Sequence, residues 1–263
     1  MTITDRRFIR PGIERITTDR HGRWYQWDGD RYWSVTTIIQ RGVSNWPITA
    51  WSKKHIARYA VDNHDTIGQM LREGLTDEAF LLLRNSPDVY RDERADIGTT
   101  LHALTEQMDR GTLDTIPPNH AADLDAYALA TEPLKVVATE MFVVNDHLKA
   151  AGTLDRLVRL PDGRLVVADL KTGATEPSYP HGVTTQCAIY AHSWRYDIEK
   201  QQRLAYLPEN EVSTEVGLLI HLPAGKAKCD LYLLDLTVGW QLAKTATAVR
   251  AVYKSKPIQK YTH

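Results

Sequence analysis

The order of apolar and polar positions along the chain predicts an α/β protein. Aromatic and polar residues alternate on both sides of Asp28-Gly29-Asp30, which indicates a hairpin of residues 23–27 and 31–36. Apolar residues at helical spacing predict helices over 49–62, 90–110, 123–130, 184–196 and 238–253. A separate capped helix is expected to start at Thr76 and to stop at Pro87. Further strands are expected over 135–144, 212–222 and 230–236.

A second hairpin lies at the centre of this pattern. Two apolar runs rich in β-branched residues, 153–160 and 164–170, flank Pro161-Asp162-Gly163, which is typical of a three-residue loop with a bulge. Pairing of Leu160 with Arg164 would set Asp155 opposite Asp169, with their Cβ atoms about 5 Å apart. Lys171 follows Asp169 by two residues and is therefore expected on the same face of the strand.

Two carboxylates and an ammonium group at one place have a specific chemical use. The carboxylates repel unless a cation lies between them, and a hard divalent ion such as Mg²⁺ or Mn²⁺ suits oxygen ligands. Lys171 could then orient a water molecule or stabilise a developing negative charge. The alternative is a surface hairpin in which Asp169 and Lys171 form a weak exposed ion pair.

Other candidate residues lie on predicted helices and on the preceding strand. His102 follows Gly98 by one helical turn, and Tyr190 follows Gln186 by one turn, so each pair shares a helix face. Glu140 lies within the predicted strand 135–144. An isolated helical histidine is more often a surface or core residue than a functional one.

Two regions are expected along the chain: a hairpin and helical lobe over residues 1–90, and a core over residues 91–263. Residues 1–22 are polar and rich in arginine, and an extended conformation is expected for them. Five of the seven tryptophans lie within the first 51 residues. Aromatic residues mixed with arginine could stack on unpaired bases, but they more often form the core of a small hairpin packed against helices.

Composition restricts the possible partners and cofactors. The net charge of −1 provides no general basic field, so any nucleic-acid contact must be local, and a short basic tail follows residue 253. Two cysteines, Cys187 and Cys229, are too few for a disulfide framework or an iron–sulfur cluster. No apolar run approaches membrane-spanning length, and a soluble, cytoplasmic protein is expected. Motifs of NTPases and of hydrolases with a covalent nucleophile are missing, so no nucleotide cofactor is expected.

Taken together, the motifs of the chain resemble those of the RecB-type branch of the PD-(D/E)XK nuclease superfamily, in particular the RecB-like exonucleases of phages and of CRISPR systems. The resemblance covers roughly residues 95–192. Its motifs are, in order, Gly98-x-x-x-His102, Glu140, Gly152-Thr-Leu-Asp155, Asp169-Leu-Lys171-Thr-Gly173 and Gln186-x-x-x-Tyr190. Each motif is weak by itself, and five in the family's order are a strong signal.

The resemblance implies a restriction-endonuclease-like core and a role for each matching residue. Asp155, Asp169 and the main-chain carbonyl of Leu170 would bind Mg²⁺ or Mn²⁺, with His102 as a further ligand. Lys171 would position the attacking water. Gln186 and Tyr190 would contact DNA or order the site. Glu140 matches the family's acidic strand residue, although a glutamate at such a position often only pairs with a neighbouring basic residue.

The resemblance also implies partners and leaves function classes open. Many RecB-like exonucleases carry four cysteines for an iron–sulfur cluster, which this chain cannot supply. The expected function is a DNA nuclease, an exonuclease acting on DNA ends or single strands in recombination or repair, together with a recombination partner protein. The alternatives are a structure-specific endonuclease and a DNA-binding or assembly module without activity.

Overall fold

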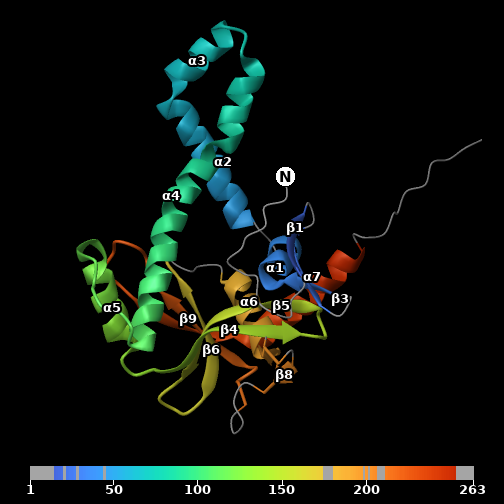
Figure 1. Cartoon of the computed structure of the whole chain (residues 1–263). Coiled ribbons are helices and arrows are strands. Elements are labelled where there is room, and N and C mark those ends of the chain that lie inside the picture. Colours follow the sequence, from blue (N-terminus) through green and yellow to red (C-terminus); the bar gives the residue numbers. More distant parts are fainter. Residues whose placement is uncertain are drawn as a thin grey trace, which may run out of the picture. The chain divides into compact units, whose positions relative to one another are not determined.

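Among the described residues of the computed structural model, ten strands form one mixed sheet with helices packed on it (Figure 1). The structure describes residues 15–19, 22–27, 30–43, 46–173, 180–197, 199–200, 202–205 and 211–252. The predicted basic tail and most of the predicted extended N-terminal segment lie outside these residues. The predicted α/β class is confirmed as a mixed central sheet flanked by helices.

The strands have the following bounds: β1 Arg15–Asp19, β2 Gly22–Trp27, β3 Asp30–Ser34, β4 Lys135–Asn145, β5 Ala150–Arg159, β6 Leu165–Lys171, β7 Trp194–Asp197, β8 Gln202–Leu204, β9 Val216–His221 and β10 Asp230–Asp235. The helices are α1 Val35–Gly42, α2 Trp46–Asp62, α3 His64–Arg72, α4 Thr76–Arg110, α5 Ala121–Thr131, α6 His181–Ala191 and α7 Leu236–Val252, with a 3₁₀ turn η2 at Pro118–His120. Among the described residues, no helix has the length and apolar character needed to cross a bilayer.

Strand β5 is the branching point of the sheet. One edge of β5 pairs with β4 in antiparallel fashion along its length. The other edge pairs with β3 in parallel at Ala150 and Ala151, and with β6 in antiparallel fashion from Arg156 to Arg159. Strand β6 then pairs in parallel with β9, and β9 pairs antiparallel with β10. Two different strands therefore share one edge of β5, and its residues 152–155 lie between them.

The contacts of the chain divide it into two compact units. The first contains residues 1–43 and 104–263, and the second contains residues 44–103. The sequence led us to expect a single boundary, between residues 90 and 91. The N-terminal hairpin belongs with the sheet because Trp33 and Ser34 of β3 pair with the main chain of β5, a contact between positions more than a hundred residues apart. The second division falls within α4, between Ala103 and Leu104.

The apolar core of the first unit lies between the sheet and helices α1, α6 and α7. Trp24 and Trp33 are directly paired across β2 and β3, and both are buried in this core. These two tryptophans therefore form part of the core of the hairpin, which was the more common of the two roles expected for the aromatic residues. Helices α6 and α7 approach closely at Gly239, where a Cβ atom would lie 2.4 Å from the carbonyl oxygen of Thr184.

The prediction that a helix stops at Pro87 was wrong, because α4 continues through this residue. A proline lacks the N–H that would bond to the carbonyl four residues earlier. Here the hydroxyl of Ser86 donates a hydrogen bond of 2.8 Å to the carbonyl of Leu83, which is the acceptor left by Pro87. A neighbouring side chain thus replaces the missing main-chain donor.

Two other element boundaries differ from the predicted ones. The helix expected over 184–196 ends at Ala191, because Trp194 and Arg195 pair with β4 as strand β7. The second strand of the N-terminal hairpin ends at Ser34, whose side chain accepts a hydrogen bond from the main-chain N–H of Thr37 and caps α1. In both places tertiary pairing or a cap overrides the local apolar pattern.

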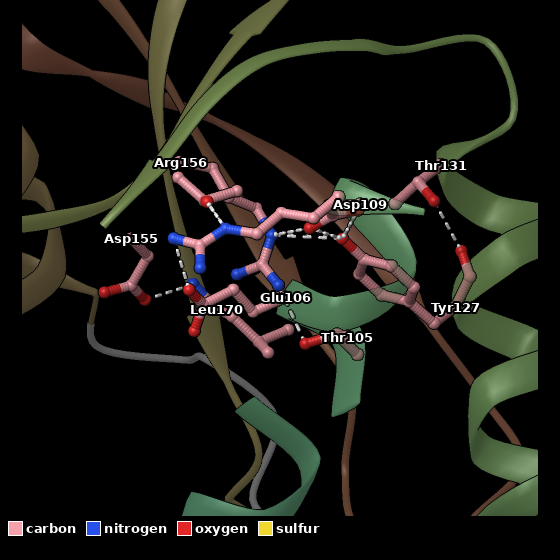
Figure 2. A network of polar contacts seen from close by, with 10 residues as sticks. Thr105, Glu106, Asp109, Tyr127, Thr131, Asp155, Arg156 and Leu170 are labelled. Carbon is pink, nitrogen blue, oxygen red and sulfur yellow. Dashed lines mark hydrogen bonds and ion pairs between the residues drawn. The ribbon is translucent and has the colours of Figure 1, made fainter. Parts of the chain in front are cut away.

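A buried polar network joins strand β5 to helices α4 and α5 (Figure 2). Nε of Arg156 donates to Oδ2 of Asp109 at 2.6 Å, and Nη2 donates to Oγ1 of Thr105 at 2.7 Å. The hydroxyl of Tyr127 donates to Oδ1 of Asp109 at 2.8 Å. The side chains of Arg156 and Asp109 are only 2% and 6% exposed, so each charge depends on the other for compensation.

We therefore expect Asp109→Ala to lower the free energy of unfolding by about 3–5 kcal/mol, because Arg156 would remain buried without its counter-charge. Equilibrium unfolding in urea measures this loss. Asp125→Ala, which removes an exposed carboxylate from α5, is the control and should change stability by less than about 0.5 kcal/mol. Equal losses in the two variants would contradict the structural role of the network.

Candidate active site

The β5–β6 hairpin has the register that the sequence predicts. Arg159 pairs with Leu165, and the N–H of Leu160 donates to the carbonyl of Arg164 at 2.9 Å. Gly163 in the loop has a φ of 90°, a conformation that favours glycine. Continuing the same register by four further pairs from Arg159 sets Asp155 opposite Asp169. The predicted register of the hairpin is thus confirmed as far as Arg156 and Ala168, one pair before Asp155 and Asp169.

Asp155 lies where β5 and β6 separate. Their ladder ends at the pair of Arg156 with Ala168, one residue before Asp155 would pair. Oδ2 of Asp155 instead accepts a hydrogen bond of 3.0 Å from the main-chain N–H of Leu170 (Figure 2). The N–H and C=O of one residue in an extended strand point to the same edge. The Leu170 carbonyl is therefore directed toward the side on which Asp155 lies.

Asp169 and Lys171 form an ion pair between Nζ and Oδ2 at the end of β6. Asp169 is only 1% exposed, whereas the Lys171 side chain is 46% exposed. Within the part of the chain that the structure describes, Oδ1 of Asp169 is buried and accepts no hydrogen bond. The prediction that Asp169 and Lys171 meet is confirmed, and the pair is partly buried rather than fully on the surface.

The electrostatics of this group favour binding of a cation. Burial, and secondarily the charge of Asp155, raise the pKa of Asp169 to about 7, although Lys171 acts in the opposite direction. Burial lowers the pKa of Lys171, but the charges of Asp169 and Asp155 outweigh it and the net shift is upward. An ammonium group thus stays charged beside a carboxyl group that is only partly ionised at neutral pH.

Helix α6 carries Gln186 and Tyr190, and the Tyr190 hydroxyl interacts electrostatically with both carboxylates. Burial raises the pKa of Tyr190, and Asp155 and Asp169 raise it further, which places its hydroxyl within the electrostatic reach of both. The Gln186 side chain forms a hydrogen bond with Tyr190 and acts in the opposite direction. A Cβ atom at Gly152 would lie 2.9 Å from the Tyr190 hydroxyl. The glycine that opens the Gly152-Thr-Leu-Asp155 motif therefore leaves room for the tyrosine ring.

Glu140 occupies an unusual position in β4. Its neighbours Thr139 and Met141 pair with Arg156 and Leu154, so the register sets Glu140 opposite Asp155. Its φ of 49° is rare for a residue other than glycine and costs on the order of 1–3 kcal/mol. Glu140 and Asp155 thus occupy facing positions of β4 and β5 by register, and the backbone is strained at Glu140.

Two histidines need separate mention, one predicted from the sequence and one that the sequence motifs did not include. His102 is half-buried on α4 and belongs to the second unit, whereas the carboxylates belong to the first. His221, which the sequence motifs did not include, ends β9 and pairs in register with Lys171. Its only signal in the sequence is a histidine that ends an apolar run.

No protein-family model matches the chain, and a comparison with curated proteins found no match.

The raised pKa of Asp169 predicts a pH dependence of stability in metal-free protein. Its folded-state pKa of about 7 lies above the ordinary value of 3.8, so the folded state binds more protons between these values. The contribution of Asp169 to the free energy of unfolding is therefore highest below about pH 4, where Asp169 is protonated in the folded state, and it falls as the pH rises through about 7. Asp169→Asn should remove this decline, so that its free energy of unfolding is a few kcal/mol higher than that of the wild type at about pH 8. Urea unfolding in EDTA across this range measures the effect, and parallel pH profiles would contradict it.

Proposed function

We propose that this chain is a metal-dependent deoxyribonuclease that hydrolyses phosphodiester bonds, and that it acts as an exonuclease on DNA ends in recombination or repair. The observation that carries the proposal is the meeting of Asp155, Asp169 and Lys171 at the end of one hairpin. A restriction-endonuclease-like core of the RecB type is part of the same proposal. The mixed sheet flanked by helices, with the hairpin at its branching point, supports it.

The oxygen atoms at this site fit a hard divalent cation. Asp169 has a buried oxygen without a donor among the described residues, and Asp155 and the Leu170 carbonyl lie at the same strand edge. The candidate ligand set consists of the carboxylates of Asp155 and Asp169 and the main-chain oxygen of Leu170. Mg²⁺ and Mn²⁺ prefer such ligands.

When bound, the ion would lower the pKa of a water molecule and neutralise charge on the phosphate. Lys171 provides three N–H donors on a half-exposed side chain, held by Asp169, and can orient the attacking water and stabilise negative charge. Asp155 is held in place by the hydrogen bond that Oδ2 accepts from the Leu170 N–H. We assign Gln186 and Tyr190 to ordering these carboxylates or to contacting DNA.

The proposal is tested with the purified protein and end-labelled linear or closed circular DNA, single- and double-stranded, in Mg²⁺, Mn²⁺ or EDTA. We expect metal-dependent loss of linear DNA only. Asp169→Asn and Lys171→Ala should each reduce the rate at least about a hundredfold, the usual effect of removing a group that stabilises the transition state. Asp162→Asn is the matched control, because Asp162 lies in the loop of the same hairpin and pairs with the exposed Arg164.

The outcomes separate the alternatives. Cutting of circular DNA would replace the exonuclease by a structure-specific endonuclease. DNA binding without cleavage in either metal would make the chain a binding or assembly module. Cleavage by Asp169→Asn or Lys171→Ala within tenfold of the Asp162→Asn control would overturn the assignment of the active site.

A further inference from the structure

His221 lies beside the proposed active site without belonging to any of its motifs. It is the last residue of β9, and in the parallel ladder with β6 it is the partner of Lys171. Only 3% of its surface is exposed. A histidine buried at the end of a central strand requires hydrogen-bond partners for a ring with two polar atoms.

One ring nitrogen of His221 has a defined partner. Nε2 lies 2.8 Å from the carbonyl oxygen of Gly173, which can only accept, so Nε2 carries the hydrogen. Nδ1 is buried and has no partner among the described residues. This hydrogen bond fixes the orientation of the ring. Its acceptor belongs to the last residue of the Asp169-Leu-Lys171-Thr-Gly173 motif.

The main chain after His221 continues this contact. The N–H of Leu222 donates to the carbonyl of Lys171 at 2.9 Å, and the N–H of Ala224 donates to the carbonyl of Thr172 at 3.1 Å. With the His221 side chain on Gly173, three consecutive carbonyls of the motif are held by residues 221–224. We call this set of three hydrogen bonds the carbonyl clamp.

The carbonyl clamp matters because Lys171 has no strand partner on its other side. The ladder of β6 with β5 ends at Ala168, three residues earlier. Of the two strands beside β6, only β9 therefore pairs with Lys171. A lysine side chain loses about 2 kcal/mol of rotamer entropy when it is held in one conformation. Errors of about 1 Å at a reacting group can reduce rates about a hundredfold.

We propose that His221 is a positioning residue of the proposed nuclease. Through the carbonyl clamp it fixes the main chain after Lys171 and so holds the ammonium group against Asp169 in the geometry required for turnover. The proposal rests on the proposed function for its effect on rate. The carbonyl clamp itself is a structural statement that can be tested in metal-free protein.

Two substitutions distinguish positioning from simple filling of the core. In His221→Gln the amide nitrogen can occupy about the place of Nε2 and donate to Gly173. In His221→Asn the shorter amide cannot reach this carbonyl, although the side chain remains polar and buried. Thr247→Val is the control elsewhere in the unit, since it also removes a side-chain donor to a main-chain carbonyl, that of Ala243.

The first measurement is hydrogen–deuterium exchange in EDTA, followed on peptides that cover residues 222–226. We expect exchange of the Leu222 and Ala224 amides to be about tenfold faster in His221→Asn than in the wild type, since one hydrogen bond of the carbonyl clamp is lost. His221→Gln and Thr247→Val should exchange as the wild type does. Unchanged exchange in His221→Asn would overturn the carbonyl clamp, whatever the activity of the protein.

The second measurement is steady-state cleavage of linear DNA. His221→Asn should lower kcat about tenfold to a hundredfold with KM and the metal concentration for half-maximal rate unchanged, and His221→Gln should restore kcat to within about threefold. Equal rates in His221→Asn and Thr247→Val, or no recovery in His221→Gln, would overturn the positioning role. Absence of cleavage by the wild type would instead overturn the proposed function, and the exchange measurement would still decide the carbonyl clamp.

Discussion

The hydrogen bond from the Leu170 N–H to the Asp155 carboxylate is the contact on which the arrangement of the candidate site depends. It forms where β5 and β6 separate and β5 begins to pair with β3. A main-chain N–H left without a partner at a buried strand edge would cost about 1–3 kcal/mol. The carboxylate supplies the missing acceptor, and in doing so it is fixed beside the buried Asp169. One requirement of the sheet thus sets the position of a functional group.

Burial of Asp169 works against stability and in favour of cation binding. An isolated carboxylate in this position would be largely protonated. Lys171 and, to a smaller extent, Arg156 oppose that tendency from within the hairpin by lowering the pKa of Asp169. A second cation at the same place would relieve both the desolvation and the repulsion from Asp155. Groups arranged at such a cost are typical of functional sites, and the strained backbone of Glu140 in the neighbouring strand has the same character.

Support for the site comes from both sides of the hairpin. Arg156, one residue after Asp155, joins β5 to α4 through a buried ion pair with Asp109, and to α5 by donating a hydrogen bond to the Tyr127 hydroxyl. Residues 221–224 hold the carbonyls that follow Lys171 on the side of β9. The two acidic residues and the lysine are therefore anchored through main-chain and buried contacts to elements that are distant in the sequence, which is what precise placement of reacting groups requires.

The sequence by itself determined the α/β class, the central hairpin and its register, and with them the meeting of Asp155, Asp169 and Lys171. These features depend on strand period and turn chemistry, which act over a few residues and can be read locally. Only the tertiary structure decided that Pro87 lies within a continuous helix, that Trp194 and Arg195 leave α6 for β7, and that the N-terminal hairpin joins the sheet. It also revealed the carbonyl clamp of residues 221–224 on the segment after Lys171. At Pro87 the partner is the adjacent Ser86, whose hydroxyl bonds to the carbonyl of Leu83. The other features depend on a strand or side chain elsewhere in the fold, and no local pattern of apolar and polar residues records which partner that is.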